Sequence, residues 1–271
     1  MGYTVAALVT VLPEHVKGKQ SKMKNFIRGI MIVSVLASTV SLSAQTPGAG
    51  AVPPSAPTAD EIVAKYVAAI GGKDAISKVK SVYTESSMSA MGSENPSTTT
   101  IVDGVGYKSE TDFNGSKIVQ CLTDKGGWTI NPMTGAVNAT PMPDDVYNAG
   151  KAQIRVGGAL YDYAAQGSKV ELLGKEGTAY KIKLTSKEKA ESVYLIDSTS
   201  YLVTSVTSSS KMQDQDVTVT TALSDYRKTD LGMLIPYAIG IDFGGQFQLL
   251  ITVKKVELNK TIDPAVFAMP K

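Results

Sequence analysis

From Ser81 onward, most of the sequence alternates apolar and polar residues with a period of two. This period is typical of β-strands, in which successive side chains point to opposite faces, whereas a helix repeats every 3.6 residues. Gly, Asn, Asp and Pro interrupt the alternation at short intervals, and Asn114-Gly115 favours a two-residue hairpin because both residues tolerate positive φ. We therefore expect antiparallel strands at about 81–91, 97–103, 105–113, 116–123, 128–131, 136–140, 168–174, 178–185, 191–197, 201–210, 215–226, 233–243 and 246–257.

Two regions depart from this alternation and predict helices. Thr58 and Glu61 have the spacing of a capping box, and apolar residues then recur at helical spacing as far as Gly71-Gly72. A short second helical piece follows before Ser81. Residues 143–160 begin with Pro-Asp-Asp and also favour a helix, although their three glycines weaken it.

The predicted fold is mainly β: a curved, unclosed antiparallel sheet, or half-barrel, of about 11–13 strands. The N-terminal helix and the mid-chain helix would cover its concave face. An open sheet of this many strands must curl, and two short helical regions cannot fill the inside of the curve completely. Two outcomes remain open, an apolar cavity beneath the helices or a space filled by side chains.

The N-terminal residues resemble an export signal. Residues 23–44 run from a basic start through an apolar stretch to small residues, and this stretch is too short to span a bilayer. We expect cleavage near Ala44 and a periplasmic location, with a buried N-terminal helix as the alternative. We expect residues 1–22 to come from an upstream start codon, residues 45–58 to form a Pro-rich flexible linker, and residues 59–271 to form the folded domain.

Composition excludes several kinds of chemistry. The single histidine, His15, lies before the expected cleavage point, so the exported chain would lack the usual general base and zinc ligand. The single cysteine, Cys121, excludes an internal disulfide and cysteine-cluster metal sites, and we expect it to be a buried thiol. Five of the 27 basic residues and one of the 25 acidic residues lie in 1–44, which leaves a small negative charge and no sign of nucleic-acid binding. We therefore expect no catalytic residues, no metal and no cofactor.

The two ends of the domain carry a family resemblance. Residues 222–239 and 251–270 contain an Asp-Tyr-Arg strand, a Gly-containing turn, a Pro in the next strand, and then Asn, Ile-Asp and Phe-x-x-Pro. These residues are Asp225, Tyr226, Arg227, Gly232, Pro236, Asn259, Ile262, Asp263, Phe267 and Pro270. With the opening ADEIVAKYVAAIGG, they make the chain resemble the LolA/LppX-like superfamily of periplasmic lipoprotein carriers, or outer-membrane lipoprotein-sorting proteins, over about residues 58–271.

This resemblance implies a half-barrel that holds lipid or lipoprotein acyl chains in an apolar hollow, without enzymatic activity. An envelope membrane protein would serve as donor or acceptor. One departure bears on the cargo, because lipoprotein carriers use an arginine on an early strand to hold the lid closed and this chain has no Arg between Thr58 and Ile154. An envelope-sensing or protein-interaction module on the same fold is the alternative function, and an enzyme on this scaffold is the third.

The residues expected to line the hollow lie on the last strands. Within 233–243 and 246–257 the apolar residues alternate and so share one face, and after Lys254-Lys255 the alternation slips by one, which predicts a bulge. Ordinary core packing is the alternative role for every one of them, and Trp128, at a strand start, is either at the mouth of the hollow or packed. The candidate ligand-binding residues are Trp128, Ile235, Tyr237, Ile239, Ile241, Phe247, Leu249 and Ile251.

Overall fold

The computed structural model describes residues 56–90, 92–212 and 215–270. The predictions for 1–22, for the signal peptide at 23–44 and for nearly all of the linker at 45–58 lie outside these residues. The helical elements are α1 (Ala59–Ala69), α2 (Gly72–Lys78), α3 (Asp144–Gly150) and the 3₁₀ turns η1 (Pro132–Thr134), η2 (Lys151–Ile154) and η3 (Pro264–Phe267). The strands are β1 (Ser81–Ala90), β2 (Ser93–Val102), β3 (Gly106–Phe113), β4 (Ser116–Thr123), β5 (Gly127–Asn131), β6 (Ala136–Pro141), β7 (Lys169–Glu176), β8 (Ala179–Thr185), β9 (Glu191–Asp197), β10 (Val203–Met212), β11 (Gln215–Lys228), β12 (Leu234–Phe243) and β13 (Gln248–Leu258).

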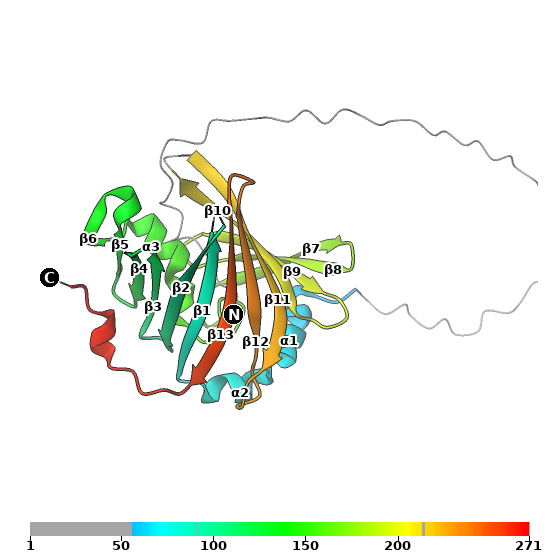
Figure 1. The fold of residues 1–271 in the computed structure, drawn as a ribbon. Helices are drawn as coiled ribbons and strands as arrows, with labels where there is room; N and C mark the ends of the chain where they lie inside the picture. The colour runs from blue at the N-terminus through cyan, green and yellow to red at the C-terminus, as the bar shows by residue number, and fades with distance from the viewer. Residues whose placement is uncertain (1–55, 91, 213–214, 271) are drawn as a thin grey trace, which may run out of the picture. The chain divides into compact units, whose positions relative to one another are not determined.

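Within the described residues these strands form one antiparallel sheet in the order β6-β5-β4-β3-β2-β1-β13-β12-β11-β10-β9-β8-β7. The chain runs outward from β1 to β6, crosses to the opposite edge through residues 142–168, and returns from β7 to β13, which pairs with β1. Figure 1 shows the curvature of this sheet, whose edge strands β6 and β7 do not pair. The predicted curved, unclosed antiparallel sheet is confirmed.

Helix α1 and the crossover at 142–168 pack on one face of the sheet, which we call the inner face. The predicted capping box is present, since the Thr58 hydroxyl accepts from the Glu61 N–H and the Glu61 carboxylate accepts from the Thr58 N–H. Ile62, Tyr66 and Ile70 are fully buried against the sheet and supply most of the apolar surface of α1. A Cβ on Gly71 would lie 2.7 Å from the Gly232 carbonyl oxygen, so the turn after α1 needs a glycine to approach the β11–β12 turn.

The helix expected over 143–160 is shorter than predicted. Helix α3 ends at Gly150, η2 adds one 3₁₀ turn, and turns occupy the rest of the crossover. Gly157 and Gly158 have φ angles of +111° and +72°, which right-handed helix excludes. The crossover is therefore a short helix followed by a chain of turns.

The strand registers confirm the bulge predicted near Lys254-Lys255 in β13 and show that β2 begins earlier than predicted. Glu85 pairs with Lys255 and Ser86 with Val253, so Lys254 is the extra residue of a bulge. Residues 92–96 were expected to be a turn, but β2 begins at Ser93. Pro96 fits there because residues 93–96 pair with β1 alone, so the missing N–H lies at an unpaired edge.

A second, smaller core lies on the other face, which we call the outer face. The chain leaves β13 at Asn259, passes below β1 and places η3 over β3–β5. There Phe267 packs with Val119, Cys121 and Trp128, and its carbonyl oxygen accepts from Trp128 Nε1 at 2.9 Å. Burial raises the pKa of the Cys121 thiol to about 12, in keeping with the buried thiol predicted from the sequence.

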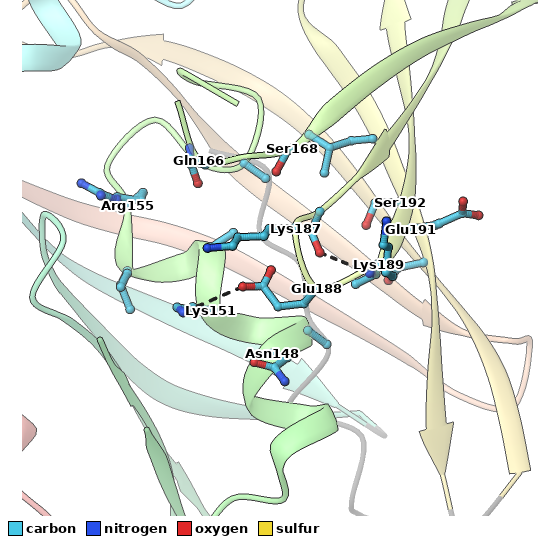
Figure 2. A pocket seen from close by; sticks show the side chains of 18 of the residues that line it. Asn148, Lys151, Arg155, Gln166, Ser168, Lys187, Glu188, Lys189, Glu191 and Ser192 are labelled. Atoms are coloured by element: carbon cyan, nitrogen blue, oxygen red, sulfur yellow. Dashed lines mark hydrogen bonds and ion pairs between the residues drawn. The ribbon is translucent and has the colours of Figure 1, made fainter. Parts of the chain in front are cut away.

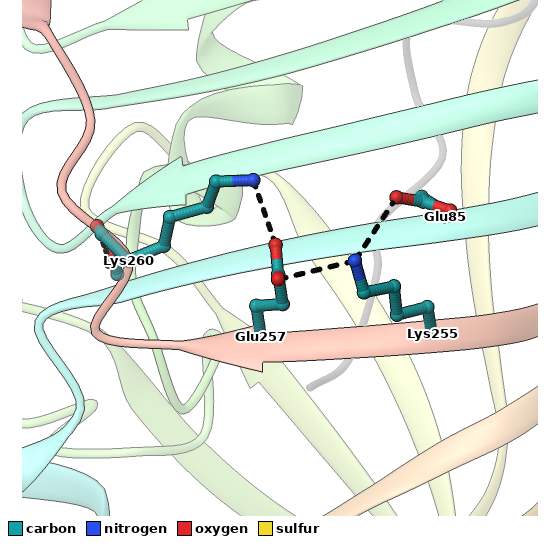
Figure 3. A network of polar contacts seen from close by, with 5 residues as sticks. Glu85, Lys255, Glu257 and Lys260 are labelled. Atoms are coloured by element: carbon teal, nitrogen blue, oxygen red, sulfur yellow. Dashed lines mark hydrogen bonds and ion pairs between the residues drawn. The ribbon is translucent and has the colours of Figure 1, made fainter.

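Over β1 and β13 the outer face carries charged side chains that are exposed to solvent. Lys255 bridges Glu85 and Glu257 at 3.6 and 3.2 Å, and Lys260 contacts Glu257 at 2.7 Å, across β1 and β13 (Figure 3). These side chains are roughly half exposed, so each pair adds little stability. Among the helices that the structure describes, none combines the length and the apolar character needed to cross a membrane.

Candidate functional site

A large pocket lies between the crossover and strands β8–β10 on the inner face. Its volume is about 730 Å³, within the range typical of small-molecule sites. Its apolar wall consists of Ile154 and Ala159 from the crossover with Leu184 and Tyr194 from the sheet, all buried. Figure 2 shows side chains of the crossover and of the β8–β9 turn around this pocket.

The rim of this pocket carries charges of both signs: Lys151, Arg155, Lys187 and Lys189 beside Asp124, Glu188 and Glu191. Lys151 contacts Glu188 at 3.9 Å across the pocket, linking the crossover to the β8–β9 turn. Among the described residues, no acidic side chain forms an ion pair with Arg155, Lys187 or Lys189, which also line it. The rim can therefore attract the negatively charged part of a ligand, while the apolar wall can contact its hydrocarbon part.

Local structure explains why the crossover holds its place on the sheet. The Asp103 carboxylate accepts from the Val156 N–H at 3.0 Å, and the Gly104 N–H donates to the Ile154 carbonyl at 2.8 Å. Both contacts come from the β2–β3 turn, where Gly104 adopts a φ of +71°. The sequence Asp103-Gly104, recognised as a turn, thus also anchors η2 and the start of the pocket rim.

A second, smaller space of about 60 Å³ lies on the inner face between β1–β4 and β12–β13. Turn η2 separates it from the larger pocket, because Gln153 faces the small space whereas Lys151, Ala152 and Ile154 line the large one. We call this small space the inner pocket. It is lined by Thr84, Ser86, Met88, Ser97, Thr99, Tyr107, Ser109, Thr111, Gln120, Gln153, Ile239, Ile241, Ile251 and Val253.

A third space, a groove of about 530 Å³, runs between α1 and residues 160–165 of the crossover. Val63, Val67 and Leu160 give it an apolar wall. Two polar contacts join α1 and α2 to the crossover beside it: the Tyr163 hydroxyl donates to Asp60, and Lys73 contacts Asp162 at 2.9 Å. The hydrogen bond to Asp60 is the main cause that raises the pKa of Tyr163 to about 12.

The eight candidate residues do not lie together. Ile239, Ile241 and Ile251 line the inner pocket, and Ile235 and Leu249 are buried in the main core. Of the three aromatic residues, Tyr237 lies under the Arg227 guanidinium at 4.4 Å, Phe247 stacks on Phe243 in the β12–β13 turn, and Trp128 belongs to the outer-face core. Of the eight, the three isoleucines border one of the three spaces described above, and a ligand-binding role for the eight residues stays a proposal.

Sequence reasoning missed the polar part of the inner face. Residues 84–111 are rich in Ser and Thr, but these residues also occupy adjacent positions, as in 97–100, so the pattern does not show which face carries the hydroxyls. The charged residues of the β8–β9 turn looked like ordinary surface. Within the described residues, no three His, Cys, Asp or Glu side chains are arranged to hold a metal ion.

The fold is similar to that of several solved structures. A DUF1329 family protein from Desulfovibrio piger is 13% identical with a TM-score of 0.52, covering 78% of this chain and 97% of that one. A LolA superfamily protein from Nitrosomonas europaea is 12% identical with a TM-score of 0.52, covering 79% and 98%. The chain has a LolA-like fold. An outer-membrane lipoprotein-sorting protein domain from Vibrio parahaemolyticus is 11% identical with a TM-score of 0.49, covering 77% and 95%.

No protein-family model and no curated protein matches the sequence. The LolA-like fold nevertheless accounts for the residues that carried the sequence resemblance. Asn259 joins the end of β13 to the α2–β1 junction by accepting from the Lys80 N–H and donating to the Lys78 carbonyl. Asp263 caps η3, and Phe267 fills the outer-face core. Asn259 thus joins the C-terminal strand to the start of the sheet, and Asp263 and Phe267 hold the C-terminal segment on the outer face.

Proposed function

We propose that this protein binds a lipid or a lipoprotein acyl chain on the inner face of its sheet and carries it through the periplasm, without a catalytic step. The observation that carries the proposal is the pocket of about 730 Å³ between the crossover and β8–β10, with its apolar wall and a charged rim on which Arg155, Lys187 and Lys189 have no acidic partner among the described residues. Such a lining suits a molecule that has a hydrocarbon part and a polar head. The LolA-like fold and the lipoprotein-sorting domain among the similar structures agree with this class of cargo.

The energetics of this binding are adequate. Each methylene group removed from water contributes about 0.8 kcal/mol, so even a partly buried acyl chain can offset the cost of ordering the ligand. The rim cations would lie near the head group, where solvent screens them, and would chiefly speed association. The crossover, held by the Asp103 and Gly104 contacts, is the element that must shift to admit a long chain.

A pair of variants on one strand tests the pocket. Ser208 and Ser205 both lie on β10; Ser208 lines the pocket and pairs with Val219, whereas Ser205 pairs with exposed Ala222 on the outer face. Ser208→Phe should fill the pocket and weaken binding of a fluorescent fatty acid about tenfold or more. Ser205→Phe, the same change on the opposite face, should leave the dissociation constant unchanged.

The purified protein gives a direct test. We expect native mass spectrometry and solvent extraction of the exported protein to recover a bound lipid. Protein that is consistently empty, and that also fails to bind the fluorescent fatty acid, would contradict the proposal. Equal loss of binding in both serine variants would place the ligand elsewhere.

The proposal extends to location and partners. Export through the signal at 23–44 would leave a mature chain that begins at Gln45, and an envelope membrane protein would deliver or accept the cargo. Mass spectrometry of the mature N-terminus in a periplasmic extract tests the first point. A chain that keeps residues 23–44 there would contradict it.

A further inference from the structure

The inner pocket differs from the rest of the inner face in its chemistry. One wall carries hydroxyl and amide groups from β1–β4, and the other carries Ile239, Ile241 and Ile251 from the last two strands. No charged side chain is among the residues that line it. A pocket of this kind fits a short polar group with hydrocarbon next to it.

Most polar groups of this pocket already have partners. The Ser97 and Thr111 hydroxyls lie 3.0 Å apart and hydrogen-bond to each other. The Ser86 hydroxyl donates to the Ser97 carbonyl oxygen at 3.4 Å. These contacts fix the polar wall without a ligand.

Gln120 is the exception. Its side chain lines the inner pocket and is 5% exposed, yet its Nε2 has no hydrogen-bond partner among the described residues. A buried donor without a partner costs about 1 to 3 kcal/mol, so proteins seldom keep one without a use. Gln120 Nε2 is thus positioned to donate to an acceptor that enters the pocket.

The surroundings restrict what that acceptor is. A carboxylate would be buried beside no positive charge, which is unfavourable. A carbonyl of an ester or amide accepts from Nε2 without carrying a charge, and its adjoining methylene groups can contact Ile239 and Ile241. Because η2 lies between this pocket and the larger one, the carbonyl of a long-chain cargo reaches Gln120 only when the crossover shifts. We propose that Gln120 in the inner pocket then binds the ester or amide carbonyl of the cargo, so that the protein selects acyl esters and amides over ethers or hydrocarbons of equal length.

This inference rests on the proposed lipid-binding function. A pair of ligands tests the inference separately from that function. 1-Monolauroylglycerol and 1-O-dodecylglycerol share a glycerol head and a twelve-carbon chain and differ in the carbonyl. Each is titrated as a competitor against a fluorescent fatty acid. The wild-type protein should bind the ester about tenfold more tightly than the ether, the amount that one buried hydrogen bond supplies.

Two variants test whether Gln120 causes the preference for the ester over the ether. Gln120→Leu keeps the approximate volume and removes the donor, so it should bring the ester-to-ether ratio to about one and leave ether binding within about twofold. Gln248→Leu makes the same change at the exposed first residue of β13 and should keep the tenfold ratio. Gln120→Met serves in place of Gln120→Leu if the latter fails to fold.

The outcomes are distinct. Failure of the fluorescent fatty acid itself to bind would overturn the proposed function together with this inference. Binding of the fatty acid without competition from either glycerol ligand would overturn the inference alone. Equal binding of ester and ether by the wild type would overturn the inference and leave the proposed function standing. A tenfold preference that survives Gln120→Leu would place the carbonyl away from Gln120 and overturn the inference as well.

Discussion

The two halves of the sheet present different chemistry to the space between them. In β8–β13 the inner face is mainly apolar, with Ile182, Ile196, Val219, Ile241 and Phe243 buried in the main core beside two buried polar residues, Ser192 and Thr221. In β1–β4 the same face carries buried Thr84, Ser86, Ser97, Thr111 and Gln120. The polar half therefore gains less stabilisation from burying its inner face than the apolar half does.

On the outer face the difference in polarity between the two halves is the opposite. Over β3–β5 it holds the apolar group of Val119, Cys121, Trp128 and Phe267, sealed by η3. Over the last strands it carries largely exposed residues such as Thr218, Ala222 and Ser224. The polar half thus buries apolar surface on its outer face, which leaves its inner face available for hydrogen bonding. The half-barrel can then combine a polar and an apolar wall without losing its stability.

Removing the seal of the outer-face core should have the largest effect. Phe267→Ala should destabilise the protein by about 3 to 5 kcal/mol, because it leaves a cavity over Trp128 and Cys121. Urea unfolding measures the loss. The Cys121 thiol, now shielded by Phe267, should also become reactive to an alkylating reagent at pH 8.

Val266→Ala is the matched control, since Val266 is an exposed neighbour in η3. It should change stability by no more than about 0.5 kcal/mol and leave Cys121 protected. If Phe267→Ala behaves like the control, the C-terminal segment does not seal the outer face. Apolar burial on the outer face of β3–β5 would then not offset the polar inner face of β1–β4.

The sequence predicted the apolar half better than the polar half. Alternating apolar residues mark the strands, so the period of two placed all thirteen strands close to their positions. The bulge at Lys254 was also visible, because it shifts the phase of the apolar residues. Both are local properties of the chain.

Long-range contacts explain what sequence reasoning missed. The sequence left Trp128 either at the mouth of the hollow or packed; it is packed because Phe267, 139 residues away, covers it, and no local pattern encodes that contact. The pocket of about 730 Å³ depends on where the crossover lies against β8–β10, which glycine-rich turns decide. Gln120 looked like an ordinary polar position within β4 until the fold placed it beside the hydroxyls of β2 and β3.

Alkaline pH offers an intermediate test of the polar half. Burial raises the pKa of Tyr107, on the inner pocket, to about 12 from an ordinary value near 10. Below pH 10 the phenol is protonated in both states, and its contribution is fully present. Between pH 10 and 12 the unfolded chain loses this proton while the folded chain keeps it, so the free energy of unfolding falls.

Tyr107→Phe isolates this contribution from those of the other tyrosines. Across pH 10 to 12 the wild type should lose about 2 to 3 kcal/mol more than the variant, since each pKa unit corresponds to about 1.4 kcal/mol. Urea unfolding at pH 8, 10 and 12 provides the measurement. Parallel pH profiles for the two proteins would mean that water reaches Tyr107 and that the inner pocket is not a dry site.

The smallest effect should come from the hydroxyl pair of the polar wall. Ser97→Ala or Thr111→Val alone leaves one buried hydroxyl without its partner at 3.0 Å and should cost about 1 kcal/mol. The double variant removes both groups, so its cost should be clearly smaller than the sum of the two single costs. Additive losses by urea unfolding would show that each hydroxyl has other partners, and that the polar wall is held by something other than this pair. A non-additive result would instead mean that these hydroxyls satisfy each other and leave Gln120 as the donor still open to a ligand.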